Sequence, residues 1–477
     1  MNEYLKFYIN GSWVEPHTPE IIEVINPADE EAYAQISAGN GHDVDRAVEA
    51  ARKAFVEYSR WSIDQRTALL ERVLEVYQTH YDQIADAISL EMGAPIDLAR
   101  GAQTKVGINH IQSAIKTIVE FEFEKFEDGM IISYEPIGVC GLITPWNWPI
   151  NQVAAKVMPA LAAGCTMILK PSEESPIDAM ILAKVLHEAG VPSGVFNLVN
   201  GYGSIVGEAM SRHPGIDMMS FTGSTRGGIA VAKASADTVK RVAQELGGKS
   251  ANIILKDTDI AKAVADGVEN CMSNSGQSCN APSRMLVPKA DMSVAIEAAA
   301  ITAKNMRVDD PSVEGDHLGP VVNRTQFEKI QNLIKVGINE GARLVAGGLG
   351  RPEHLERGYY VKPTVFANVT SDMTIAREEI FGPVIVIMEY ESEEQAIEIA
   401  NNTEYGLAGF VSSSNLDHAV NVAKKIRAGQ VSINYIGDNT DTPFGGFKQS
   451  GNGRENGCWG LGEFLEVKAI MGAAAPS

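Results

Sequence analysis

The chain has 477 residues, too many for one hydrophobic core, and its hydrophobic fraction of 45% supplies apolar material for two or more domains. Its formal net charge of −21 argues against binding to nucleic acid or to an anionic membrane. The N-terminus has no apolar signal core, and no apolar run approaches the roughly 18 residues of a membrane span, so we expect a cytoplasmic protein. The five cysteines include no Cys-x-x-Cys pair, which favours neither a disulfide framework nor a zinc site.

The first part of the chain has the apolar spacing of helices. From residue 43 to about residue 98, apolar residues recur at spacings of three and four, which predicts scaffold helices. After a further helical run, residues 119–134 alternate charged and apolar side chains and predict a hairpin that turns at Asp128 and Gly129.

From Pro136 onward, short apolar runs alternate with helical patterns, which predicts a parallel sheet of the dinucleotide-binding type. Ligands bind at the carboxyl ends of the strands in such sheets, so the loops there are candidate binding sites. Residues 257–431 repeat the alternation and predict a second α/β domain. The first expected strands cover residues 139–143, 166–170, 195–199 and 218–221, with helices from about Asn151, Ile177, Ser204 and Gly227.

Two of these loops carry groups suited to a dinucleotide. Gly223 and Ser224 stand between a strand and a helix start, where backbone N–H groups and the helix dipole hold a pyrophosphate, although a plain tight turn explains this loop equally well. The loop from Lys170 to Glu173 ends another strand, and its carboxylate is placed to accept hydrogen bonds from ribose hydroxyls. A solvated surface pair is the alternative for this second loop.

Two further segments carry candidate catalytic groups. Asn147 lies between two tryptophans and two prolines that stiffen the backbone, so we expect its amide to stabilise an oxyanion. Two glycines follow Glu245 and permit a close backbone approach. Partial burial of this carboxyl group would raise its pKa, whereas a solvated turn glutamate is the alternative.

The segment from Cys271 to Arg284 predicts an exposed thiol. We expect a helix that breaks at Gly276 into a tight loop, with Pro282 preventing helical continuation. Such a loop places the thiol of Cys279 beside backbone N–H groups, which is typical of a reactive thiolate. An inert small hydrophobe is the common alternative for a single cysteine.

Seven motifs carry a resemblance to a known family. In chain order they are Pro-Trp-Asn-Trp-Pro, Lys-Pro-Ser-Glu, Phe-Thr-Gly-Ser, Glu-Leu-Gly-Gly-Lys, Gly-Gln-x-Cys, Glu-Ile-Phe-Gly-Pro and Pro-Phe-Gly-Gly-Phe-Lys. Their order and spacing, over nearly the whole chain, resemble the aldehyde dehydrogenase superfamily. The resemblance implies an α/β fold assembled as a homodimer or homotetramer. It implies a Rossmann-like NAD-binding domain at 1–117 and 137–247, an α/β catalytic domain at 248–458, and a small β oligomerisation segment at 118–136 and 459–477.

The resemblance also implies a role for each matching residue. Cys279 matches the family's nucleophile, Glu245 its general base, and Asn147 its oxyanion amide. Trp148 replaces a phenylalanine, and Ala155 stands where many members have a bulky residue in the substrate tunnel, so the resemblance does not identify the aldehyde. The positions that match cofactor contacts are Trp146, Lys170, Glu173, Gly223, Ser224, Glu379 and Phe381.

These roles imply one reaction. The Cys279 thiolate adds to a small-molecule aldehyde, NAD takes the hydride, and water activated by Glu245 hydrolyses the resulting thioester to the carboxylic acid, with no metal ion. The charge of Glu173 would repel the 2′-phosphate of NADP, so we expect NAD to be preferred.

The substrate and the fate of the thioester remain open at this stage. A coenzyme-A acylating dehydrogenase would use the same thiol, but such members of the family generally lack the glutamate found at position 245. A non-enzymatic, crystallin-like binding protein would have lost Cys279 or the glutamate. Asp438 and Asp441 precede the expected tunnel entrance and predict discrimination against anionic semialdehydes, unless both carboxylates face solvent.

Overall fold

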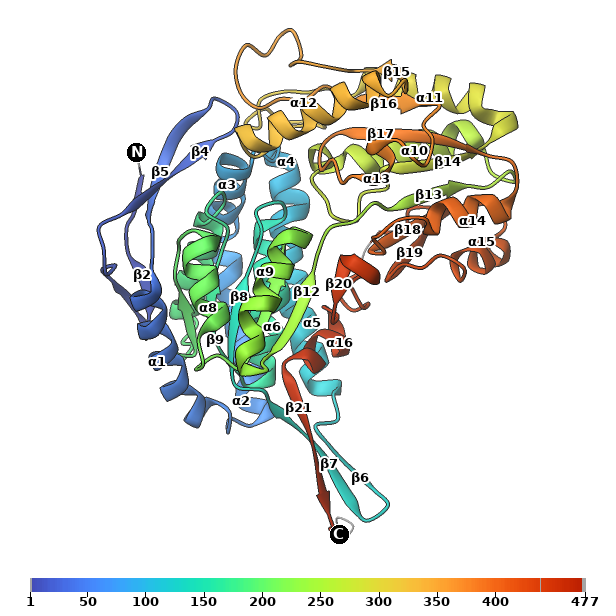
Figure 1. The fold of residues 1–477 in the computed structure, drawn as a ribbon. Helices are drawn as coiled ribbons and strands as arrows, with labels where there is room; N and C mark the ends of the chain where they lie inside the picture. Colours follow the sequence, from blue (N-terminus) through green and yellow to red (C-terminus); the bar gives the residue numbers. More distant parts are fainter. Residues whose placement is uncertain (1, 438, 474–477) are drawn as a thin grey trace.

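The structure is a computed structural model and describes residues 2–437 and 439–473. Two sheet-based parts lie side by side, and a slender arm extends from the first of them (Figure 1). The α/β class expected from the sequence is confirmed. Within the two described ranges, no helix combines the length and the apolar character that a membrane span requires.

The first sheet has eight strands in the order β20-β12-β11-β8-β9-β10-β2-β3. Its centre is parallel, as the alternation of strands and helices predicts. Every residue of β8, β9 and β11 is buried, because helices cover both faces of the sheet. The strands are β2 (Phe7–Ile9), β3 (Ser12–Val14), β8 (Val139–Ile143), β9 (Thr166–Lys170), β10 (Phe196–Leu198), β11 (Met218–Thr222), β12 (Arg241–Glu245) and β20 (Gly451–Asn452).

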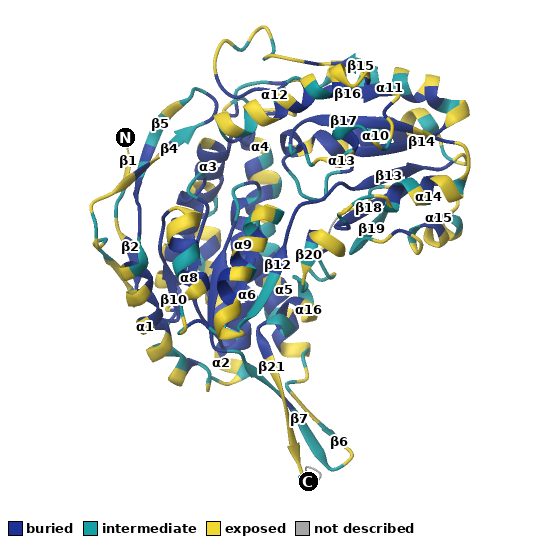
Figure 2. Cartoon of the chain, viewed as in Figure 1, coloured by how far each residue is buried: buried dark blue, intermediate teal, exposed yellow. Residues whose placement is uncertain are grey.

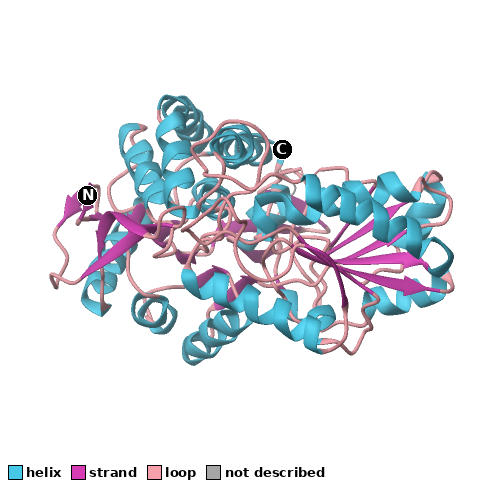
Figure 3. Ribbon diagram, turned by 90° about the horizontal axis from the view of Figure 1, so that it is seen from above, coloured by secondary structure: helices cyan, strands magenta, loops and turns pink. Residues whose placement is uncertain are grey.

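Helices pack on both faces of this sheet (Figure 3). One face packs on α1, α8 and α9 through apolar side chains such as Val44, Met210 and Val231. The other face packs on α6 and α7, and these contact α2, α3 and α5 in turn. The helices are α1 (Gly41–Tyr58), α2 (Ile63–Thr79), α3 (Tyr81–Met92), α5 (Lys105–Glu120), α6 (Pro149–Ala163), α7 (Ile177–Glu188), α8 (Glu208–Arg212) and α9 (Thr225–Ser235).

The second sheet has seven strands in the order β15-β16-β17-β14-β13-β18-β19. Side chains alternate between its faces: Leu286 belongs to the core on one side, and its neighbours Met285 and Val287 belong to the core on the other. Helices α10 and α11 cover one face, and α12, α14 and α15 cover the other. The elements are β13 (Ala251–Ile254), α10 (Ile260–Met272), β14 (Arg284–Pro288), α11 (Met292–Asn305), α12 (Arg324–Asn339), β15 (Arg343–Ala346), β16 (Thr364–Ala367), β17 (Val384–Tyr390), α14 (Glu393–Asn401), β18 (Ala408–Ser412), α15 (Leu416–Ala423) and β19 (Gln430–Ile433).

The arm is a three-stranded antiparallel sheet with the order β21-β7-β6. Strands β6 (Glu124–Glu127) and β7 (Met130–Pro136) form the predicted hairpin, and both turn residues have positive φ, 49° at Asp128 and 76° at Gly129. The predicted C-terminal strand, β21 (Leu465–Met471), pairs with β7 along its whole length. Much of the surface of the arm is exposed, in contrast to the buried strands of the two large sheets (Figure 2).

Some elements differ from the sequence expectations. Helix α6 begins at Pro149 rather than at Asn151, because proline is well tolerated in the first turn of a helix. The helix expected from Ser204 is a short π-helical turn (Gly203–Gly207) that continues into α8. The sequence analysis gave no strands before residue 41, where β2 and β3 join the first sheet and three others form a separate sheet. These are β1 (Asn2–Tyr4), β4 (Ile21–Asn26) and β5 (Glu31–Ser37).

Candidate active site

The thiol of Cys279 lies in a loop with an unusual backbone. Helix α10 ends at Met272, so the prediction that it continues to Gly276 was wrong. Asn274 and Ser275 both adopt left-handed conformations, with φ of 53° and 54°, and Gly276 follows with φ of 70°. A Cβ atom on Gly276 would clash with the carbonyl oxygen of the glycine at 382, so the close approach requires glycine here. This reversal leaves Cys279 partly exposed, as the sequence predicts.

Hydrogen bonds fasten this loop to the segment that contains Asn147. The Nδ2 of Asn147 donates to the carbonyl of Gln277 at 2.9 Å, and its own carbonyl accepts from the Nδ2 of Asn274 at 2.8 Å. The indole Nε1 of Trp148 donates to the hydroxyl of Ser278 at 2.8 Å. The predicted rigidity of the Asn147 segment is therefore achieved through side-chain bonds to the thiol loop. An amide nitrogen carries two N–H donors, so Asn147 keeps one for a ligand.

The glycines after Glu245 permit the close backbone approach that the sequence predicts. A Cβ atom on Gly248 would clash with the carbonyl oxygen of Cys279. The backbone N–H of Gly248 donates to Oε1 of Glu379 at 2.9 Å. The thiol loop and Glu379 therefore pack against the same short turn.

Glu245 is buried at the carboxyl end of β12 and is only 4% exposed, so the alternative of a solvated turn glutamate is wrong. Burial raises the pKa of Glu245 well above its ordinary value, as predicted, and the nearby charge of Glu455 raises it further, while Lys156 and Arg454 oppose the shift. No donor among the described residues bonds to the Oε2 atom of Glu245. The carboxyl group is therefore an unsatisfied acceptor inside the protein.

A buried ion pair beside Glu245 was not found from the sequence. The Nζ atom of Lys156 lies 2.5 Å from Oε1 of Glu455 and 3.0 Å from Oγ of Ser220, and the Lys156 side chain is 1% exposed. The signal was present: Lys156 is the only charged residue in the α6 sequence, which is otherwise mostly apolar. A lysine in such a helix needs a buried partner.

Cys279 and Glu245 lie in different cavities. Cys279 lines a cavity of about 510 Å³, which we call the thiol cavity, together with Trp148 and Ala155. Glu245 lines a separate space of about 10 Å³, which we call the acid cavity. Ala155 and Glu455 line both. The structure thus brings the thiol and the Asn147 segment together and places Glu245 on the other side of a shared wall.

Gly223 and Ser224 connect β11 to α9. Ser224 is the N-cap of α9, and its Oγ accepts the N–H of Gly227 at 3.2 Å. The N–H of Gly223 donates to the backbone carbonyl of Glu245 at 3.0 Å. The loop therefore has the strand-to-helix geometry that suits an anion at the helix N-terminus.

Lys170 and Glu173 form an ion pair at the end of β9. The Nζ and Oε2 atoms are 2.7 Å apart, and the side chains are 3% and 28% exposed. The alternative of a solvated surface pair is therefore wrong for Lys170, although the carboxylate keeps access to solvent.

Phe381 and Trp146 meet across the two sheets. Their ring centroids are 5.4 Å apart with an interplanar angle of 88°. Phe381 has a φ of 60°, an unusual conformation for a bulky residue that marks a constrained loop. Since Trp146 follows a strand of the first sheet and Phe381 precedes one of the second, the candidate site lies between the two parts.

The acidic residues expected at the tunnel entrance are only partly described. Asp438 lies outside the described residues. The Oδ2 atom of Asp441 lies 2.8 Å from Nζ of Lys116, and this hydrogen bond lowers the pKa of Asp441. Asp441 is therefore matched by a cation rather than standing as an isolated negative charge. Among the described residues, no group of three or more His, Cys, Asp or Glu side chains has the arrangement of a metal site.

The chain was compared with known proteins. The model of the aldehyde dehydrogenase family matches residues 13–470. A 3-succinoylsemialdehyde-pyridine dehydrogenase from Pseudomonas sp. is 53% identical over 473 residues, covering 99% of each chain. A mutant aldehyde dehydrogenase from Pseudomonas syringae, solved with NAD+ and octanal, is 51% identical with a TM-score of 0.98, covering 99% of this chain and 98% of that one. An aldehyde dehydrogenase from Bartonella henselae is 50% identical with a TM-score of 0.97, covering 98% of this chain and 99% of that one. With its thiol loop and its whole length matched in this way, the chain belongs to the aldehyde dehydrogenase family.

Proposed function

We propose that this protein oxidises an aldehyde to the carboxylic acid with NAD, through a thiohemiacetal and a thioester on Cys279. The observation that carries the proposal is the mutual fastening of the thiol loop and the Asn147 segment beside a cavity of about 510 Å³. The site fixes one thiol and one amide donor in place, as acyl transfer through an oxyanion requires.

The residues at the ends of the first sheet fit NAD. The N-terminus of α9 at Ser224 suits the pyrophosphate, and the carboxylate of Glu173 suits the ribose hydroxyls. Lys170, Glu379, Gly223, and the ring pair of Trp146 and Phe381 complete the proposed cofactor-binding set. The relative from Pseudomonas syringae was solved with NAD+, which supports the same cofactor here. When bound, NAD supplies the hydride acceptor.

Addition to the aldehyde rests on two groups of the chain. The Cys279 thiolate attacks the carbonyl carbon, and the oxygen becomes negatively charged. The Asn147 amide and the backbone N–H of Cys279 donate hydrogen bonds to this oxygen. Expulsion of hydride then leaves a thioester on Cys279.

Glu245 is the proposed base of the hydrolytic step. Its carboxylate removes a proton from water as the water oxygen attacks the thioester carbon, and the thiolate leaves. Burial raises the pKa of this carboxyl group, which makes the carboxylate a stronger base than an exposed glutamate.

The first prediction separates hydrolysis from the earlier steps. Glu245→Gln should still produce a burst of NADH close to one equivalent per active site, since addition and hydride transfer do not need a base for water. Steady turnover should fall on the order of 10² to 10⁴-fold, the usual contribution of a general base. Stopped-flow absorbance at 340 nm measures both phases.

Cys279→Ser is the matched control, because it should abolish the burst and the turnover alike. Normal turnover of Glu245→Gln, or a requirement of the wild-type protein for coenzyme A, would replace hydrolysis with the acylating alternative. Absence of NADH formation with every aldehyde tested would favour a non-enzymatic role.

We infer that the substrate is a small-molecule aldehyde and that the arm mediates self-association as a homodimer or homotetramer. The thiol cavity is large enough for a medium-length aldehyde, and the Pseudomonas syringae relative was solved with octanal. Strand β21 is an edge strand and exposes Val467, Ile470 and Met471. An exposed apolar edge of this kind suits pairing with a second copy.

A further inference from the structure

Three cavities meet at one small side chain. Ala155 lies in α6 and is 5% exposed. It lines the thiol cavity, the acid cavity and a third space between α5, α6 and α16 (Gly457–Glu463), which we call the side cavity. The side cavity measures about 20 Å³ and the acid cavity about 10 Å³. Each is close to the space that one water molecule needs.

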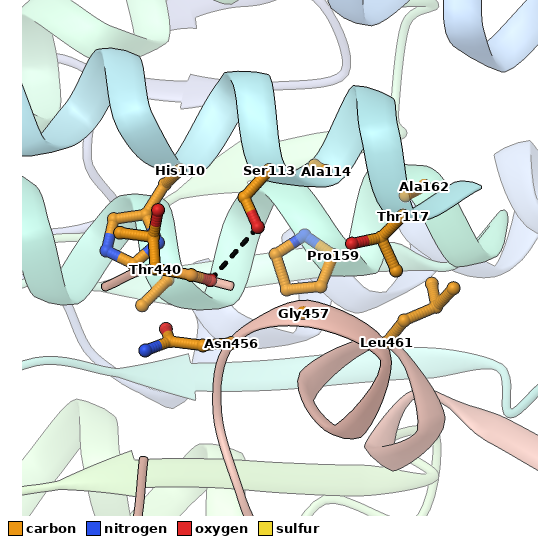
Figure 4. A pocket seen from close by; sticks show the side chains of 11 residues that line it. His110, Ser113, Ala114, Thr117, Pro159, Ala162, Thr440, Asn456, Gly457 and Leu461 are labelled. Atoms are coloured by element: carbon orange, nitrogen blue, oxygen red, sulfur yellow. Dashed lines mark hydrogen bonds between the residues drawn. The ribbon is translucent and has the colours of Figure 1, made fainter. Parts of the chain in front are cut away.

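The side cavity has polar groups that suit water. Ser113 and Thr117 project from α5 toward the start of α16, where Asn456 also lies (Figure 4). The Ser113 hydroxyl donates to the backbone carbonyl of Thr440 at 3.0 Å, which leaves its oxygen as an acceptor. A buried water needs two to four polar partners, and these groups supply them.

The acid cavity also needs a polar occupant. The Oε2 atom of Glu245 is buried and has no donor among the described residues. Lys156 and Glu455 line the same cavity and provide further hydrogen-bonding groups. A water there would satisfy Glu245 Oε2, since an unpaired buried acceptor is unfavourable by about 1–3 kcal/mol.

The route of this water is constrained during turnover. Once an acyl group is attached to Cys279, it occupies the thiol cavity, so water from that side is obstructed. Cys279 does not line the side cavity. The side cavity therefore remains a source of water at the stage when hydrolysis needs it, and the wall common to all three spaces is at Ala155.

We propose that Ala155 is a positioning residue for hydrolysis: its small side chain keeps open a passage by which water moves from the side cavity to Glu245 and the thioester. This inference rests on the proposed hydrolytic function. The step is balanced. One water O–H proton passes to the Glu245 carboxylate, the water oxygen bonds to the acyl carbon, the C–S bond breaks, and the thiolate of Cys279 departs with the electron pair. The products are the carboxylic acid and the free thiol after protonation, and no oxidant is consumed.

A size series at this position tests the proposal. Ala155→Gly, Ala155→Val and Ala155→Leu should fall in steady turnover in that order, with Leu lower than wild type by on the order of tenfold to a hundredfold, a part of the general-base contribution. The NADH burst should stay near one equivalent in all three. Propanal is the substrate, because a short chain avoids direct contact with the added methyl groups. Intact-protein mass spectrometry after acid quench should show the propionyl adduct accumulating on the Val and Leu variants.

The control is Ala87→Val in α3, since Ala87 is 6% exposed and lies in none of the three cavities. It should lower the melting temperature, as overpacking does, but leave the ratio of burst to steady turnover unchanged. Equal loss of burst and turnover in Ala155→Val would overturn the proposal and make Ala155 only a wall of the thiol cavity. Unchanged turnover in Ala155→Leu would overturn it as well. A wild-type protein that oxidises no aldehyde would instead contradict the proposed function itself.

Discussion

Glu173 keeps 28% of its side chain exposed while its partner Lys170 is almost completely buried. The buried ammonium therefore holds the carboxylate at the carboxyl end of β9, where it would meet the adenosine ribose of NAD. A 2′-phosphate at that place would bring a second negative charge against Glu173. Cofactor preference is thus expected to depend on this one charge.

The prediction is that Glu173→Ser narrows the preference for NAD over NADP by about tenfold or more, because the like-charge repulsion of NADP is removed. The ratio of kcat/KM for the two cofactors measures the change. Glu174→Ser, the same substitution one residue along, should leave the ratio as in the wild type. If the wild-type protein uses both cofactors with equal efficiency, Glu173 does not contact the ribose.

At the same scale, the sequence predicted Cys279 and Asn147 because each lies in a short loop whose glycines and prolines restrict the backbone. It did not predict that Glu245 would face a separate cavity. That arrangement depends on the distant C-terminal segment: a Cβ atom on Gly445 would lie 2.6 Å from Oε1 of Glu245. No local pattern reports which segment packs on a side chain 200 residues away.

At the scale of elements, the start of α7 rests on a buried carboxyl pair. Glu91 of α3 accepts the N–H of Ile177 at 2.8 Å and that of Asp178 at 3.2 Å, and both carboxyl side chains are 0% exposed. Burial raises the pKa of Asp178 to about 7 and raises the pKa of Glu91 well above its ordinary value. The neighbouring hydroxyls of Tyr33 and Tyr77 also have raised pKa values and stay neutral in this range.

This pair predicts a loss of stability as the pH rises. Asp178 binds a proton in the folded chain up to a pH of about 7, whereas in the unfolded chain it loses the proton near its ordinary pKa of 3.8. The unfolded state therefore binds fewer protons in this window, and the free energy of unfolding falls as the pH rises through it. Asp178→Asn removes the titration, so its melting temperature should fall less than that of the wild type between pH 5 and pH 8.

Scanning calorimetry at the two pH values measures the difference. The exposed Asp64 of α2 provides the control, because Asp64→Asn should show the same pH dependence as the wild type. A parallel decline in the wild type and Asp178→Asn would mean that the carboxyl pair does not titrate in this range.

The elements themselves were predictable where side-chain period decided them. Strands β8, β9 and β11 appear as apolar runs of the length a buried parallel strand needs. Element ends were less predictable, since α10 stops at Met272 for a reason that lies in the second sheet, the close contact of Gly276. The short strands β2 and β3 were missed because three residues carry too little periodicity to recognise.

At the scale of the whole molecule, the arm is the feature with the least internal support. Val467 is 63% exposed, Ile470 is 45% exposed and Met471 is 79% exposed on the edge strand β21. If the arm mediates self-association, two lysines there should prevent it by burying unpaired charge. The double substitution Val467→Lys and Ile470→Lys is predicted to reduce the solution mass to that of one chain, as measured by multi-angle light scattering.

Val56→Lys is the matched control, because Val56 is 58% exposed in α1 and far from the arm. Its mass should equal that of the wild type. An unchanged mass for the double variant would place the assembly interface on another face.

The hydrogen bonds between Asn147 and Gln277 join residues 130 positions apart, and Lys156 pairs with Glu455 across 299 positions. A chain emerging from the ribosome therefore cannot assemble this chemistry until almost all of it has been synthesised. During refolding, recovery of helical circular dichroism should precede recovery of enzyme activity, since contacts between distant segments close late. Until that point the thiol has neither its amide partner nor its base, so an incomplete chain carries a cysteine without the means to attack the aldehydes of the cell.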